Sequence, residues 1–199
     1  DVVSVLSIPE LKKLSIERLF NLLRYWVKSE TETSPSRNLL HEIVKTIINA
    51  KQDVNSVIIY SSFEFRKYQE EFDLLKTRTD IDDKSDVDWE PTTPVVLPRL
   101  NARFTAVNKL GAGLKLELLN KSLRICFRQG GEYFHPENRQ HSQRLKKLLQ
   151  EEGVPPWERA TFPLLYFNDE CIAVIGLWFS KKYVVDENEH GWVIEIEKT

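Results

Sequence analysis

Residues 125–157 read ICFRQGGEYFHPENRQHSQRLKKLLQEEGVPPW. In this stretch two adjacent glycines join a strand pattern to a helix pattern. Leu123, Ile125 and Phe127 alternate with Arg and Cys residues, and this period of two predicts a strand over 123–127 with one buried face. Gly130 and Gly131 end the strand, because glycine adopts turn conformations that other residues avoid.

A short basic helix follows this turn. Ser142 precedes leucines at helical spacing, which predicts a helix over about 142–152 that ends at Gly153 before two prolines. Basic side chains lie before and within it: Arg139, Arg144, Lys146 and Lys147. Adjacent glycines, a helix start and Arg or Lys side chains are the groups that bind phosphate oxygens. Solvated surface charge explains the same residues, so the pattern alone leaves both interpretations open.

The formal net charge of −2 conceals charge blocks. Residues 121–147 carry seven Lys or Arg against two Glu, which predicts a basic patch. Residues 79–90 carry six acids against Lys84, and Pro91, Pro94 and Pro98 follow. This acidic, proline-rich composition is typical of a linker. We therefore expect a domain over 1–78, a linker over 79–100 and a second domain over 101–199.

The first domain begins with helix signals. Ser7 and Glu10 suggest a capping box, Ser15 precedes a helix expected over about 16–29, and Ser36 precedes a second amphipathic pattern. Strand-forming residues then occur at 57–60, 63–67 and 72–75, which predicts a hairpin or small meander.

The second domain is expected to be rich in strands. Further strand patterns cover 114–119, 163–167, 171–176 and 192–196. The predicted fold class is α+β, with a helical domain carrying a small β-hairpin, followed by a strand-rich α+β domain with one basic helix. Four aromatic residues are interpreted as core rather than base-stacking groups: Phe20, Trp26, Phe127 and Trp157.

Composition places the chain among ordinary globular proteins, at 41% hydrophobic and 29% charged residues. The longest apolar run, 171–179, is too short to cross a bilayer, and no signal segment opens the sequence. Two cysteines without metal-ligand spacing fit a reducing compartment. We expect a soluble cytoplasmic protein, and the lack of Met suggests an excised portion of a longer one.

Familiar catalytic motifs are missing from the sequence. GxxxxGK[ST], GxSxG, HExxH and paired CxxC do not occur, and the four histidines form no i, i+4 pair. We therefore assign no catalytic residue and expect no metal site.

The run 125–157 resembles the C-terminal domain of bacterial tRNA(Ile)-lysidine synthetases, whose hallmark is a basic RKLKK-like helix followed by GVPPW. Residues 163–166, 172–176 and Gly191-Trp192 look like that domain's closing strands. Upstream, Arg24-Tyr25-Trp26, Pro35-Ser36-Arg37 and residues 63–68 are similar to the substrate-binding domain that precedes it in the family.

The resemblance implies that the parent protein ligates lysine to the wobble cytidine of a minor isoleucine tRNA, using ATP with Mg²⁺. The family's N-terminal ATP-pyrophosphatase-type domain, with its SGGxDS loop, has no counterpart in this sequence. We therefore expect this chain alone to be inactive and to hold no cofactor. The ATP and lysine sites cannot be placed on it.

The same resemblance implies that these two domains hold the tRNA. The four basic residues of the helix region would contact phosphates of the acceptor stem, and Arg128, Gly130 and Gly131 would shape the same cleft. In the first domain Arg37, at a helix start, and Arg66 or Lys67, on the outward face of a strand, would grip a second part of the tRNA. Glu132 is expected to pair with Arg128 or Arg144.

Two other functions remain open at this point. The basic helix of a protein-interaction module would meet an acidic partner, or the acidic C-terminal tail, residues 186–197, of a second copy in a homodimer. A self-contained enzyme has less support, because no nucleophile, base and orienting group occur together.

Overall fold

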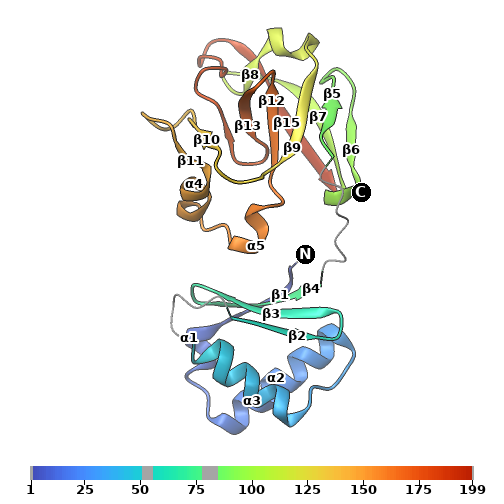
Figure 1. The fold of residues 1–199 in the computed structure, drawn as a ribbon, viewed down its shortest axis with the longest axis vertical. Helices are drawn as coiled ribbons and strands as arrows, with labels where there is room; N and C mark the ends of the chain where they lie inside the picture. The colour runs from blue at the N-terminus through green and yellow to red at the C-terminus, as the bar shows by residue number, and fades with distance from the viewer. Residues whose placement is uncertain (1, 51–55, 78–84, 199) are drawn as a thin grey trace. The chain divides into compact units, whose positions relative to one another are not determined.

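The computed structural model describes residues 2–50, 56–77 and 85–198. The chain divides into two compact units, Asp1–Ile81 and Asp82–Thr199 (Figure 1). Each unit is described by itself below.

Unit 1 is a four-stranded antiparallel sheet, in the order β1-β4-β3-β2, with its helices on one face (Figure 1). The strands are β1 (Val2–Ser7), β2 (Val57–Tyr60), β3 (Phe63–Tyr68) and β4 (Glu71–Lys76). The helices are α1 (Ile8–Leu11), α2 (Ile16–Thr31), α3 (Arg37–Ile43) and the π-helix η1 (Val44–Ile48).

Serine side chains cap the two main helices where the sequence predicts it. Ser15 Oγ accepts a hydrogen bond from the backbone N–H of Arg18 at 3.4 Å, and Ser36 Oγ accepts one from Leu39 at 3.2 Å. Each bond satisfies a donor of the first turn that has no partner within the helix. Ser7 also precedes a helix, but its side chain forms no capping bond.

The core of unit 1 lies between the helices and the sheet. Leu23, Leu40 and Ile43 are fully buried on the helices, and Phe65 and Phe72 are fully buried on β3 and β4. Ring contacts link Trp26 to both phenylalanines, and the indole N–H of Trp26 donates to Ser4 Oγ at 2.6 Å. The helix-free face of the sheet carries the alternate residues of each strand.

The meander that the sequence allowed is formed by β2, β3 and β4, but β1 extends it to a four-stranded sheet. The description of a helical domain with only a small β-hairpin is therefore corrected. The strand β1 was not foreseen, because it is held by pairing with β4, whose residues lie about 70 positions further along the chain. The residues near β1 in the sequence therefore do not indicate that it pairs with β4.

Unit 2 contains two antiparallel sheets and a short ribbon. The five-stranded sheet consists of β14 (Trp178–Phe179), β13 (Glu170–Val174), β12 (Pro163–Phe167), β9 (Leu123–Phe127) and β5 (Val87–Trp89), in that order. The four-stranded sheet consists of β6 (Val95–Leu97), β7 (Ala102–Leu110), β15 (His190–Lys198) and β8 (Leu114–Lys115). The ribbon pairs β10 (Tyr133–Phe134) with β11 (Gln143–Arg144).

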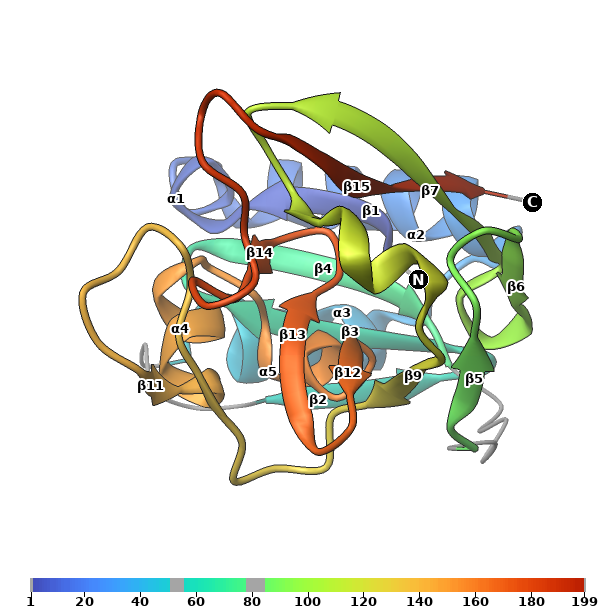
Figure 2. The same ribbon diagram turned by 90° about the horizontal axis from the view of Figure 1, so that it is seen from above.

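Four short helices complete unit 2: α4 (Leu145–Glu151), α5 (Pro156–Arg159) and the 3-10 helices η2 (Pro98–Leu100) and η3 (Leu116–Asn120). One hydrophobic core, including Phe104, Ile125 and Trp192, contains residues of both sheets. A second core joins Leu164 of the five-stranded sheet to Leu145, Leu148 and Leu149 of α4. Unit 2 is thus layered as sheet, sheet and helix, with α4 beside β11 (Figure 2).

Three expectations for this unit need correction. The predicted linker 79–100 contains β5 and β6, whose Trp89 and Leu97 are buried in the core, while residues 78–84 lie outside the described part of the chain. The predicted strand 114–119 is a two-residue strand followed by a 3-10 helix. The basic helix begins at Leu145, because Gln143 and Arg144 pair with β10 and Ser142 Oγ donates to the carbonyl of Phe134.

The aromatic residues interpreted as core fall into two groups. Trp26 and Phe127 are buried, as predicted. Phe20 and Trp157 are half-buried, and Phe20 packs against the core of unit 1. Among the described helices, none is long and apolar enough to span a membrane.

Candidate nucleic-acid interface

The helix α4 presents two exposed lysines, and its buried leucines hold it in a fixed orientation. Leu145, Leu148 and Leu149 are at most 1% exposed, so their burial fixes the orientation of the helix. Lys146 and Lys147 project from its exposed faces. Lys147 Nζ lies 3.7 Å from Glu151 Oε1, whereas Lys146 forms no ion pair within the described ranges.

Arg144 lies at the junction between β11 and α4. It is opposite Tyr133 in the ribbon, and its Nε donates to the Tyr133 hydroxyl at 3.1 Å. This hydrogen bond raises the pKa of Arg144 above its already high ordinary value, so the side chain stays charged. The guanidinium carbon is 5.9 Å from the Tyr133 ring centroid, and Tyr133 itself is 61% exposed. A cation and an aromatic face are thus available to solvent together.

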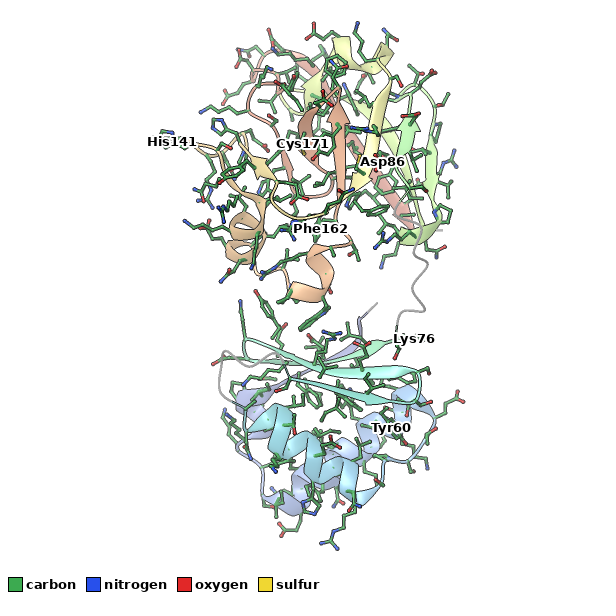
Figure 3. All side chains as sticks on the ribbon, viewed as in Figure 1. Tyr60, Lys76, Asp86, His141, Phe162 and Cys171 are labelled. Atoms are coloured by element: carbon green, nitrogen blue, oxygen red, sulfur yellow. The ribbon has the colours of Figure 1, made fainter. Side chains whose placement is uncertain are left out.

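Arg139 is brought to the other end of α4 by an ion pair. Its Nη2 donates to Glu151 Oε2 at 2.8 Å, and its carbonyl accepts from Lys181 Nζ at 3.4 Å. The loop that carries Arg139 joins β10 to β11, and His141 lies at its tip (Figure 3). The structure therefore gathers four predicted residues around one helix, and we call them the α4 basic surface: Arg139, Arg144, Lys146 and Lys147.

The glycine turn is closed on Glu132. One oxygen of that carboxylate accepts from the backbone N–H groups of Gln129 and Gly130, both at 2.6 Å. Arg128 Nε lies 3.3 Å from the other oxygen, and both side chains are only 12% exposed. The predicted pairing of Glu132 with Arg128 is confirmed. The backbone N–H groups of Gln129 and Gly130 already donate to Glu132 and so stabilise the loop. The Gly130 N–H is therefore not available to bind an anion.

The glycines of this turn are required by the backbone. Gly130 and Gly131 have φ angles of +104° and +90°, which other residues rarely adopt. A Cβ atom on either would meet no other atom within 4 Å. Their role is therefore conformational. At the start of α4 the Leu145 N–H is also taken, since it donates to the Glu132 carbonyl at 2.9 Å.

The residues predicted in the first domain lie in unit 1. Arg37 is the first residue of α3 and is exposed. Arg66 lies on the helix-free face of β3, where its Nε and Nη2 contact Glu64 Oε2 at 2.7 and 2.6 Å. Lys67 was expected on the same outward face, but it is 5% exposed and donates to the carbonyl of Ala50 at 2.8 Å. Burial, followed by the charge of Lys12, lowers the pKa of Lys67.

A pocket of about 290 Å³ was missed by the sequence reasoning. It lies on the α4-facing side of the five-stranded sheet, and its lining includes Asp86, Arg124, Tyr166 and Asp169. Burial raises the pKa of Tyr166 to about 12, so its hydroxyl stays protonated. Two local signals were present in the sequence, the alternation of Arg124 with the buried residues of β9 and the cleft expected at Gly130. The pocket as a whole was not foreseen, because Asp86, Tyr166 and Asp169 come from distant segments. No group of His, Cys, Asp and Glu in the described ranges could hold a metal ion.

Comparison with known proteins identifies both units. Residues 6–71 match the family described as the TilS substrate binding domain, and residues 123–196 match the family described as the TilS substrate C-terminal domain. The two matches define the chain as a substrate-binding domain followed by a C-terminal domain of one protein family. It is 31% identical over 194 residues to the tRNA(Ile)-lysidine synthase of Coxiella burnetii, and 30% identical over 194 residues to that of Pectobacterium atrosepticum. The chain belongs to the tRNA(Ile)-lysidine synthase family.

These alignments include 98% and 97% of this chain but 43% of each relative, so the chain spans less than half of their length. It corresponds to the C-terminal portion of the family. A solved structure, titled crystal structure of TILS C-terminal domain, is similar over 57% of this chain and 98% of its own, with a TM-score of 0.44 and 15% identity.

Proposed function

We propose that this chain binds tRNA through the α4 basic surface and through unit 1. It serves as the substrate-holding portion of an enzyme that ligates lysine to the wobble cytidine of a minor isoleucine tRNA with ATP. The relatives' name, tRNA(Ile)-lysidine synthase, supports the substrate. ATP, Mg²⁺ and lysine would be used by the remaining part of the enzyme.

One observation carries the proposal: four cations are grouped around a helix whose leucines fix its orientation. Arg139, Lys146, Lys147 and Arg144 with its partner Tyr133 are presented by α4 and the adjoining ribbon. Arg and Lys are the residues that neutralise RNA phosphates, and contacts to phosphates position a duplex without reading its sequence. Arg37 would add a contact from unit 1, and so would Arg66 if RNA displaces its contact with Glu64.

The test compares RNA binding by the chain and by an Arg144/Lys146/Lys147→Ala variant, using filter binding at several salt concentrations. If the three residues contact phosphates, the variant loses about tenfold or more in affinity, and the slope of log K against log salt decreases by about two to three. A matched control removes the same charge from the other sheet of unit 2, with Arg103, Lys109 and Lys198 changed to Ala. The control variant should bind RNA like the unchanged chain.

The choice of RNA separates positioning from discrimination. Equal affinity for the minor isoleucine tRNA and an elongator methionine tRNA would mean that this portion positions tRNA and another part discriminates. No binding of either tRNA at low salt contradicts the proposal and favours a protein-interaction module that uses the basic helix. Sedimentation of the same samples tests the homodimer expectation.

A further inference from the structure

The pocket on the five-stranded sheet differs in chemistry from the α4 basic surface beside it. Its lining contains three carboxylates, from Asp86, Glu132 and Asp169, and one guanidinium, from Arg124. Glu132 is already paired with Arg128, so the remaining charge is still acidic. Such a lining repels phosphate groups and favours a ligand that presents hydrogen-bond donors.

Two planar groups stand next to each other in this pocket. Arg124 is opposite Tyr166 in the pairing of β9 with β12, and its guanidinium carbon is 5.9 Å from the Tyr166 ring centroid. Asp86 Oδ2 lies 3.7 Å from Arg124 Nε; Asp86 is labelled in Figure 3. Guanidinium planes and aromatic rings are the surfaces on which unpaired bases stack in RNA-binding proteins.

Asp169 supplies an uncommitted acceptor. It lies in the turn between β12 and β13 and is exposed, with no ion pair among the residues whose structure is described. Ionised carboxylates only accept hydrogen bonds. The exocyclic amino groups of adenine, cytosine and guanine are donors, and uracil has no such group.

The pocket is joined directly to the α4 basic surface. Glu132 lines the pocket, its side chain holds the loop at Gly130, and its carbonyl accepts the N–H of Leu145, the first residue of α4. An RNA whose phosphates lie on α4 therefore has a concave, acidic site at the edge of its footprint. The cavity volume is close to the lower end of the range for small-molecule sites, about 300 Å³, which suits a single base.

We propose that this pocket receives one unpaired, amino-bearing base of the RNA held by α4. The base would stack on Arg124 and Tyr166, and its amino group would donate hydrogen bonds to Asp86 and Asp169. The proposal rests on the proposed function, and it adds a site that reads base chemistry next to one that binds phosphates.

The test uses a hairpin RNA with a blunt end as the reference. The same hairpin is then given a tail of three unpaired adenosines or three unpaired uridines. Each tail is placed at the 5′ end in one molecule and at the 3′ end in another. The intact chain should bind one of the adenosine-tailed hairpins at least about fivefold more tightly than the blunt one. The corresponding uridine tail should add less, because it offers no amino donor. This comparison requires no variant.

The Asp169→Asn variant keeps the shape of the side chain at an exposed turn but replaces a charged, acceptor-only carboxylate by a neutral amide, whose oxygen is a weaker acceptor. It should reduce the gain from the adenosine tail and leave the affinity for the blunt hairpin unchanged. Glu195→Gln on β15 of the other sheet is the matched control, and it should keep the full gain. Equal binding of tailed and blunt hairpins, or an equal gain from adenosine and uridine, overturns the pocket proposal while the proposed function stands. Failure to bind any of the hairpins or tRNAs overturns both.

Discussion

The surroundings of Cys126, on β9, change the pKa of its thiol. Burial and the neighbouring Asp86 carboxylate raise its pKa to about 11, and burial raises the pKa of Cys171 on β13 to about 12. Since the thiolate is the reactive form, both cysteines should be poor nucleophiles near neutral pH.

A pH series of alkylation tests this expectation. At pH 8 the folded chain should have about 100-fold less Cys126 thiolate than the unfolded chain, whose thiols titrate near 9. Because the native pKa is raised, the alkylation rate of Cys126 should keep rising about tenfold per pH unit beyond pH 9. Peptide mass spectrometry of quenched iodoacetamide reactions, with a urea-denatured control, measures both rates. A rate that levels off near pH 9 in the native chain contradicts the assignment.

At the scale of elements, Glu132 connects a loop, a strand and a helix. Its carboxylate accepts two backbone N–H groups and pairs with Arg128, and its carbonyl accepts the first N–H of α4. Loss of the side chain leaves those amides without an acceptor and a largely buried guanidinium without its counter-charge. Either effect alone costs stability.

The Glu132→Ala variant should therefore lower the free energy of unfolding by about 2–4 kcal/mol. Denaturant titration followed by tryptophan fluorescence measures the change. Glu152→Ala is the control, because Glu152 is exposed just after α4 and pairs with no residue in the described part of the chain. A loss below about 0.5 kcal/mol in Glu132→Ala would mean that water replaces the carboxylate.

The same scale shows what the sequence could predict. The helices α2 and α3 and the strand β9 were foreseen, because serine caps and apolar periodicity are local signals. The strands β1 and β7 were missed, since each is held by pairing with a distant segment. The α4 basic surface was foreseen as a group because its residues lie within ten positions. The pocket was not, because Asp86, Arg124 and Asp169 are brought together only by the pairing of β5, β9 and β12.

At the scale of the whole molecule, each unit contains its own hydrophobic cores. The core of unit 1 draws on residues 6–74, and the two cores of unit 2 draw on residues 87–194. Residues 1–81 and 82–199, expressed separately, should therefore each unfold cooperatively on heating. Their far-ultraviolet circular dichroism spectra should add up to that of the full chain. A non-cooperative melt of either piece would show that it depends on the other.

The pairing of β1 with β4 brings the two ends of unit 1 together, since Val2 lies opposite Leu75. The polypeptide thus enters and leaves this unit on neighbouring antiparallel strands. Such a module can be spliced into a surface loop of an unrelated protein without forcing that loop's ends apart. Unit 1 is therefore suited to insertion into another protein as a separately folding domain. Such a chimera would display the exposed arginines of unit 1 on the surface of the recipient protein.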